Sequence, residues 1–236
     1  MSPEAHIVRL SAWAPGIESP EEWKEWALGK RAIVHGAKGP EITFTDPIFR
    51  RRLSQISKMT IQVTRDLMPA GFCSDVSRAE NTKIFFLSFR GELSRQFQIN
   101  KTLIQEKTVS PAAFSLSVFN APVALATIAL GLKGGYTALY PGKNSFSTGI
   151  KAAEAALVSG DAPAELIFVY ADEELPPEYQ GFSECSPPAA FGLLLSSTPN
   201  PLSIPLSSIN KDENNPLAFL RQLLLCGKIN TSAFTG

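Results

Sequence analysis

The side chains that could act as nucleophiles, bases or metal ligands are few and scattered in this 236-residue chain. The three cysteines, Cys73, Cys185 and Cys226, are an odd number without any short spacing, which argues against a disulfide framework and against a zinc site. The two histidines, His6 and His35, both lie near the N-terminus. We therefore expect no metal and no cofactor, and little histidine-based catalysis.

A cluster of hydroxyls runs through Ser145-Phe146-Ser147-Thr148-Gly149, at an expected strand-to-helix turn. A hydrolase with a nucleophilic serine at such a turn needs a histidine later in the chain, and none follows His35. The hydroxyls are better explained as caps of a helix N-terminus.

Three consecutive acids, Asp172, Glu173 and Glu174, follow an apolar strand. Carboxylates at the end of a strand can bind metal or transfer protons. Adjacent side chains point in different directions, however, and no histidine is close in sequence. The pattern therefore favours a solvated acidic loop.

The composition excludes several classes of protein. Hydrophobic residues make up 44% of the chain and charged residues 19%, which is typical of a protein with a core and not of a disordered chain. The 22 basic and 22 acidic residues balance, so no positive field attracts nucleic acid or an anionic membrane. Prolines and polar residues interrupt the uncharged stretch 108–132, which predicts a buried helix and no membrane insertion. The N-terminus lacks the apolar run of a secretory signal, so we expect a cytoplasmic protein.

Apolar runs and helix signals alternate along the chain. Strands are predicted at 6–12, 83–89, 136–140, 166–170 and 189–196. Helices are predicted at 19–29, 50–68, 92–106, 120–130, 144–158 and 217–225. The alternation predicts an α/β fold in one domain, 1–236, with a mostly parallel sheet covered on both faces.

The segment 109–172 resembles the N-terminal half of β-ketoacyl synthases, the condensing enzymes of fatty-acid and polyketide biosynthesis. Val109-Ser110-Pro111 resembles the family's "(I/V)SP", and Gly131-Leu132-Lys133-Gly134 resembles its "GL+GP". Small residues at 152–162 precede a buried strand, and 49–68 resembles an earlier helix of the family. The resemblance implies a thiolase-like fold, with a mixed sheet flanked by helices, that lacks most of the usual C-terminal half.

The resemblance also implies that the catalytic nucleophile is lost. In active ketosynthases the cysteine lies nine residues after the last glycine of the "GL+G" motif, and counting from Gly134 reaches Lys143. The family's two catalytic histidines, which lie in the C-terminal half, are also absent. A helix N-terminus lowers the pKa of a cysteine thiol but disfavours a lysine ammonium. Lys143 either reaches solvent or contacts a carboxylate or carbonyl of a partner.

Type II polyketide systems pair an active ketosynthase with a chain-length factor that has lost its cysteine. The chain resembles a shortened partner of this kind, as in aryl polyene biosynthesis. The resemblance implies a non-catalytic subunit of a β-ketoacyl-ACP synthase (acyltransferase) complex. Its expected partner is an active ketosynthase, in a heterodimer or a higher assembly, with acyl carrier protein bound through the complex.

In the family, the segment between "SP" and the following asparagine reaches the partner's acyl tunnel. The expected tunnel and interface residues are Ala112, Ala113, Phe114, Leu116, Ser117, Phe119 and Asn120. Our hypothesis is that the two alanines leave the tunnel open, while Phe114 or Phe119 closes it at greater depth.

Two other functions stay open. One is a stand-alone acyltransferase, or an initiating, decarboxylating ketosynthase-like enzyme, with Cys73, Ser145 or Ser147 as its nucleophile. The other is a scaffold that binds acyl carrier protein without a ketosynthase. Because half of the family fold leaves apolar helix faces uncovered, we expect poor behaviour alone and stability in a heterodimer.

Overall fold

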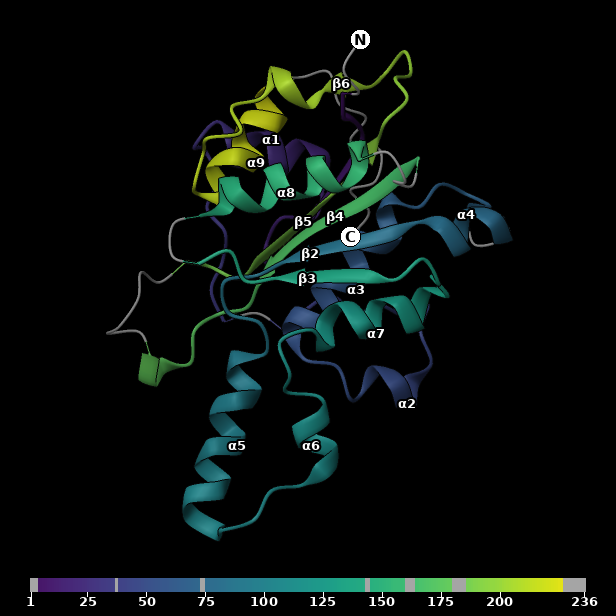
Figure 1. Ribbon diagram of the computed structural model, residues 1–236. Helices are drawn as coiled ribbons and strands as arrows, with labels where there is room; N and C mark the ends of the chain where they lie inside the picture. The colour runs from purple at the N-terminus through teal and green to yellow at the C-terminus, as the bar shows by residue number, and fades with distance from the viewer. Residues whose placement is uncertain are drawn as a thin grey trace.

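The computed structural model describes residues 4–36, 38–72, 75–142, 145–159, 164–179 and 186–226. Its centre is a six-stranded sheet with the order β3-β2-β4-β5-β1-β6 (Figure 1). The strands are β1 (His6–Trp13), β2 (Lys83–Leu87), β3 (Tyr136–Leu139), β4 (Glu165–Asp172), β5 (Ala189–Ser196) and β6 (Ile204–Pro205).

The sheet is mixed, so the expectation of a mostly parallel sheet was wrong. β2 pairs in parallel with β3 and β4, whereas the β4–β5, β5–β1 and β1–β6 pairings are antiparallel. A parallel pairing needs a long crossover, usually a helix. Between β4 and β5 the described chain forms only the short 3-10 helix η2 (Pro177–Tyr179), and the chain returns in the opposite direction.

Helices cover both faces of the sheet, as the sequence predicted. They are α1 (Pro20–Ala27), α2 (Pro47–Arg50), α3 (Gln55–Leu67), α4 (Val76–Asn81), α5 (Leu93–Glu106), α6 (Pro111–Ser115), α7 (Ala121–Leu130), α8 (Phe146–Val158) and α9 (Pro216–Leu225). α1, α8 and α9 pack on one face, and α3 and α7 pack on the other (Figure 1).

The predicted helix 50–68 begins later in the structure, as α3 at Gln55, and the separate short helix α2 precedes it at Pro47–Arg50. Asp46 caps α2 through the N–H groups of Ile48 and Phe49. Ser54 begins α3, because its Oγ accepts a hydrogen bond from the N–H of Ser57 at 3.1 Å. A serine that caps a helix has extended backbone dihedrals, which ends the continuous helix expected from the apolar spacing.

The C-terminal helix belongs to the core of the first face. Phe219 of α9 is fully buried, and its ring lies 5.2 Å from that of Phe146 in α8 and 6.3 Å from that of Phe191 in β5. Arg221 stacks over Trp26 of α1. Residues 216–225 therefore cover the sheet beside α8.

The second face is covered by α3 and by the apolar helix α7. Val123, Ala126 and Leu130 of α7 are buried, whereas Ile128 is 69% exposed. Gly131 ends α7 in the left-handed conformation, with φ 66°, as its C-cap position predicted. None of the helices in the described part of the chain has the length and apolarity needed to span a bilayer.

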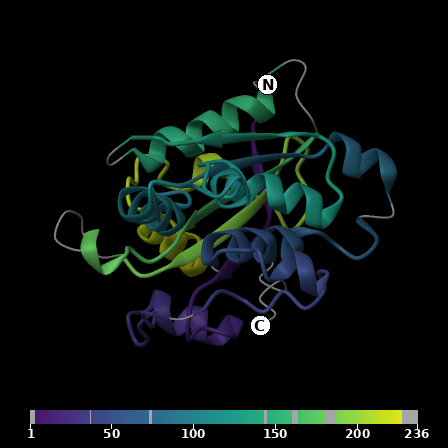
Figure 2. The same ribbon diagram turned by 90° about the horizontal axis from the view of Figure 1, so that it is seen from below.

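Helices α5 and α6 project from one end of the sheet as a helical arm, defined here as residues 93–115 (Figure 1). Seen from below in Figure 2, both helices are viewed nearly along their axes. Neither helix has a buried residue. Several large apolar side chains of the arm face solvent, with Ile104 72% exposed and Phe114 60% exposed.

We expect Phe219→Ala to lower the free energy of unfolding by about 3–5 kcal/mol, because it leaves a cavity between α9, α8 and β5. Urea denaturation measures the change. Leu225→Ala, on the same helix at a side chain that is 51% exposed, is the matched control and should change stability little. Equal small effects would mean that α9 is not part of the core.

Candidate functional site

Three buried carboxylates lie where β2 and β4 end and the arm begins. The exposed fractions of Glu92, Asp172 and Glu173 are 0%, 4% and 3%. The prediction of a solvated acidic loop at 172–174 was therefore wrong for Asp172 and Glu173. β4 continues through Asp172, two residues beyond its predicted end, so these acids lie inside the junction of strand and arm.

Asp172 connects the ends of the two parallel strands. Its carboxylate accepts hydrogen bonds from the Ser88 hydroxyl at 2.6 Å, from the Tyr170 hydroxyl at 2.9 Å and from the N–H groups of Phe89 and Arg90, each at 3.0 Å. Burial raises the pKa of Asp172, while the Ser88 hydrogen bond and the Arg90 charge oppose that rise. With its oxygens occupied by these donors, Asp172 holds the loop after β2 in place.

Glu92 connects the arm to α3. It accepts hydrogen bonds from the hydroxyls of Ser54 at 2.6 Å and Ser57 at 2.7 Å. Its second oxygen lies 3.0 Å from Arg95 Nε. The two groups form an ion pair, but the N–H of Arg95 is not aligned for a hydrogen bond. Burial raises the pKa of Glu92, and the serine hydrogen bonds and Arg95 oppose the shift.

Glu173, which lies outside α5, caps the N-terminus of that helix. Its carboxylate accepts a hydrogen bond from the N–H of Ser94 at 2.8 Å, in the first turn of α5. The α5 N-cap residue, Glu92, makes no side-chain cap bond of its own. An anion at a helix N-terminus is favourable. Burial nevertheless raises the pKa of Glu173 to about 7, and the neighbouring charges of Glu92 and Asp172 add to the shift.

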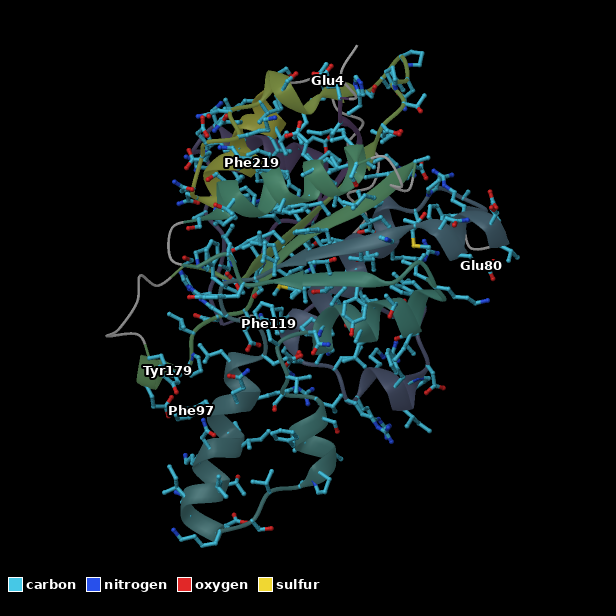
Figure 3. The ribbon with its side chains drawn as sticks, viewed as in Figure 1. Glu4, Glu80, Phe97, Phe119, Tyr179 and Phe219 are labelled. Atoms are coloured by element: carbon cyan, nitrogen blue, oxygen red, sulfur yellow. The ribbon has the colours of Figure 1, made fainter. Side chains whose placement is uncertain are left out.

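A cleft of about 830 Å³ opens beside these carboxylates, between the arm and the segment after β4. Ser94, Gln98 and Ile99 of α5 line it from one side, and Glu173 and Leu175 from the other. The arm is also attached to η2, because the rings of Phe97 and Tyr179 meet edge to face at 5.6 Å (Figure 3).

The structure separates the residues that were expected at the acyl tunnel. Ala113 lines the cleft, whereas Ala112 and Phe114 are exposed on α6. Phe119 packs away from the arm's tip, with its ring 6.1 Å from that of Phe86 (Figure 3).

The remaining residues of that set connect the arm to the sheet edge. Ser117 is buried, and its carbonyl accepts a hydrogen bond from Gln96 Nε2 at 3.0 Å. Asn120 Nδ2 donates to the Tyr136 hydroxyl of β3 at 2.9 Å, and Leu116 is half-buried. Lys143 lies outside the described residues.

Two of the alternative nucleophiles, Cys73 and Ser147, can be placed as follows. Cys73 lies outside the described residues, and the Ser147 hydroxyl donates to Asn214 Oδ1 at 2.7 Å. His35 Nδ1 lies 3.1 Å from Glu174 Oε1. Gly149 has a packing role, because a Cβ there would lie 1.7 Å from a Leu87 methyl group.

No group of three or more histidine, cysteine, aspartate or glutamate side chains is arranged to hold a metal ion in the ranges that the structure describes. The carboxylates at the base of the arm were not predicted as a cluster from the sequence. The usable signal was their position, because each lies at the carboxyl end of β4 or after the carboxyl end of β2 or β4. Their function in the fold is to join those ends to the arm.

Comparison with known families places the chain. The model of the β-ketoacyl synthase N-terminal domain matches residues 23–222. The chain belongs to the β-ketoacyl synthase family. No significant match was found among curated protein sequences.

Solved structures confirm the thiolase-like fold. The chain is 28% identical, with a TM-score of 0.62, to a chain of the complex between the ketosynthase ApeO and its chain length factor ApeC from Xenorhabdus doucetiae. That match covers 82% of this chain and 79% of the other, so the two are of similar length. The ishigamide ketosynthase/chain length factor is 15% identical, with a TM-score of 0.59, and the match covers 82% and 62% of the two chains.

A third structure, a type II polyketide acyl carrier protein in complex with its ketosynthase bound to the hexaketide, is 14% identical. Its TM-score is 0.63, and the match covers 83% of this chain and 64% of the other. In the two lower-identity matches, the chain thus spans less than two thirds of its relative. At that identity they show the fold alone.

We expect stability to fall as pH rises from about 4.5 to 7, since folded Glu173 keeps its proton to a higher pH than the unfolded chain does. The full effect of this carboxyl is on the order of 3 kcal/mol. Burial raises the pKa of Asp66 to about 6, so Asp66 changes the stability in the same direction over this pH range. In Glu173→Gln the free energy of unfolding should fall less over this pH range, because most of the contribution of Glu173 is missing.

Urea denaturation at about pH 5 and about pH 8 measures this dependence. Glu178→Gln, at an exposed glutamate of η2, is the control and should keep the wild-type dependence. An unchanged pH dependence in Glu173→Gln would show that this carboxyl is not buried in solution.

Proposed function

We propose that the chain is a chain-length-factor-like subunit, non-catalytic by itself, that pairs with an active β-ketoacyl synthase. Together they would elongate a polyene or polyketide chain on acyl carrier protein, and this subunit would shape the acyl tunnel. The observation that carries the proposal is the similarity, over most of both chains, to a chain of the ketosynthase–chain length factor complex. The presence of Lys143 at the position of the nucleophile supports it.

The surface around β3 and the arm suits such a partner. β3 is an edge strand, so one side of its backbone has no neighbouring strand in the described sheet. Large apolar side chains lie exposed beside it, with Ile128 69% exposed, Tyr136 38% exposed and Tyr140 57% exposed. Together with Phe114 on the arm, they form a surface that water covers poorly.

The assembly would bring two kinds of subunit into one enzyme. We propose that the active ketosynthase supplies the cysteine and histidines, that acyl carrier protein docks mainly on that subunit, and that the complex works in the cytoplasm. Aryl polyene biosynthesis is the proposed setting, and the chain is proposed to act as one ketosynthase-like domain. Acyl labelling of the isolated chain tests the rival enzyme, because a labelled side chain here would reveal an unrecognised nucleophile.

The first experiment co-expresses the chain with the ketosynthase encoded beside it and measures the mass of the purified species by light scattering. A stable complex, together with a scarce or aggregated lone chain, is the expected result. A well-behaved monomer or homodimer that does not bind the ketosynthase would overturn the proposal.

Ile128→Asp should weaken the complex at least tenfold, because it places a charge in the apolar surface beside β3. Val76→Asp, at a similarly exposed valine on α4, is the control and should leave binding unchanged. Titration of one labelled subunit with the other measures both affinities. Equal affinities of the two variants would place the interface elsewhere.

Ala113→Phe should shorten the product, because the larger side chain projects into the cleft at the base of the arm. The matched control is Ala112→Phe, since Ala112 is the exposed neighbour on the same helix and does not line the cleft. Mass spectrometry of the acyl chains made by the purified complex gives their length. The same product length from both variants and the wild type would contradict a tunnel that passes Ala113.

A further inference from the structure

The charges of the chain are unevenly distributed, although basic and acidic residues balance overall. Residues 38–65, all of which the structure describes, contain six basic and two acidic residues, a net charge of +4. They include α2, which lies at the periphery of the molecule, and most of α3 (Figure 1). The balanced total excludes a positive field around the whole molecule, but this segment keeps a local one.

The basic residues of the segment lie on one surface, because the chain before α2 runs beside α3. A Cβ at Gly39 would lie 3.1 Å from the Cβ of Lys58, and the guanidinium of Arg65 stacks over the ring of Phe44 at 5.4 Å. Lys58 and Arg65 lie on the same stripe of α3, two turns or about 10 Å apart. The basic surface is defined here as the exposed side chains of residues 38–52 together with Lys58 and Arg65.

Four cations of the basic surface form no ion pair with a carboxylate of the described chain, namely Lys38, Arg51, Arg52 and Lys58. Basic residues elsewhere do pair, as Lys211 does with Glu154 and Arg78 with Glu165. Of the two acids in the segment, Asp46 is occupied as the cap of α2. Cations that are held together without counter-charges attract an anionic partner.

Large apolar side chains lie exposed among these cations. Ile48 of α2 is 64% exposed and Phe44 is 44% exposed. Basic side chains around exposed apolar ones are typical of protein surfaces that lie against an anionic membrane, where the cations meet headgroups and the apolar groups enter the acyl boundary. The planar guanidinium group of arginine also matches the oxygens of a phosphate.

The spacing of the cations favours an extended partner. A small anion is held by donors that converge on one point, whereas these cations follow the chain from residue 38 to residue 65. A folded acidic protein would need a shape that fits around Ile48, and a fluid lipid surface adapts to it.

We propose that the basic surface binds the headgroups of anionic phospholipids at a membrane surface, with Ile48 inserted among them. The proposal does not depend on the proposed function. The surface assigned there to the ketosynthase, around β3 and the arm, includes none of these residues, so one subunit can make both contacts.

Vesicle flotation over a series of lipid concentrations tests the proposal with the full chain, alone or in complex with the ketosynthase. Vesicles of phosphatidylglycerol and phosphatidylcholine in equal parts should bind at least roughly tenfold more tightly than vesicles of phosphatidylcholine alone. Added salt should weaken the binding, because it screens the headgroup charges. Equal binding to the two kinds of vesicle, or binding to neither, would overturn the proposal.

Arg51→Gln combined with Arg52→Gln should weaken binding to the anionic vesicles roughly tenfold or more, because each basic residue near such a surface accounts for about fivefold. Lys24→Gln combined with Lys30→Gln is the matched control. It removes the same charge at exposed lysines in and just after α1, which packs on the opposite face of the sheet, and it should leave binding nearly unchanged. Equal losses in the two double variants would show that only the net charge matters and would contradict a specific surface.

Ile48→Ser should weaken vesicle binding severalfold, whereas Leu202→Ser, at a leucine that is 62% exposed, should not. Unchanged binding in Ile48→Ser would contradict the inserted geometry. Binding of acyl carrier protein that requires Arg51 and Arg52, without binding to anionic vesicles, would assign the surface to an acidic protein and overturn the proposal. Light scattering with the ketosynthase keeps the two proposals separate, because the arginine variants should still form the complex.

Discussion

The burial of three carboxylates at one junction is the constraint on which the arm and the cleft depend. Glu92, Asp172 and Glu173 lie where two parallel strands end, out of reach of bulk water. Charged groups in such a place require donors, and the structure supplies serine hydroxyls, backbone N–H groups and Arg95. Each of these donors comes from a different part of the chain. The carboxylates therefore position α3, the β2 loop and α5 together.

This junction makes an otherwise unsupported arm possible. α5 and α6 bury none of their own residues, so the attachments at their base must set the direction in which they project. The arm exposes Ile104 and Phe114, and α7 and β3 expose Ile128 and Tyr136. In a family whose solved structures include paired subunits, such a surface is well suited to a partner. The same geometry places Ala113 and Glu173 in the lining of one cleft.

The opposite face of the sheet is closed within the described chain. α9 adds Phe219 to the aromatic cluster of Phe146, Phe168 and Phe191, and Lys211 pairs with Glu154 on the outer side of α8. This helix covers apolar surface that would otherwise face solvent on this side. Several large apolar side chains that the described residues expose lie on the arm, on α7 and on β3 or next to them, namely Leu103, Ile104, Phe114, Ile128, Tyr136 and Tyr140.

Local patterns in the sequence determined most of the elements, including the full extent of β5 and the glycine that ends α7. That Lys143 takes the position of the nucleophile is implied by the resemblance of the sequence to the family, and it stays a prediction. Tertiary structure alone decided the antiparallel half of the sheet and the burial of Asp172 and Glu173. Glu173 meets its donor Ser94 across 79 residues, and Asp172 meets Ser88 across 84. Adjacent acidic residues in a sequence indicate side chains that are exposed to solvent. Their burial is possible here because hydrogen-bond donors from distant segments of the chain reach them.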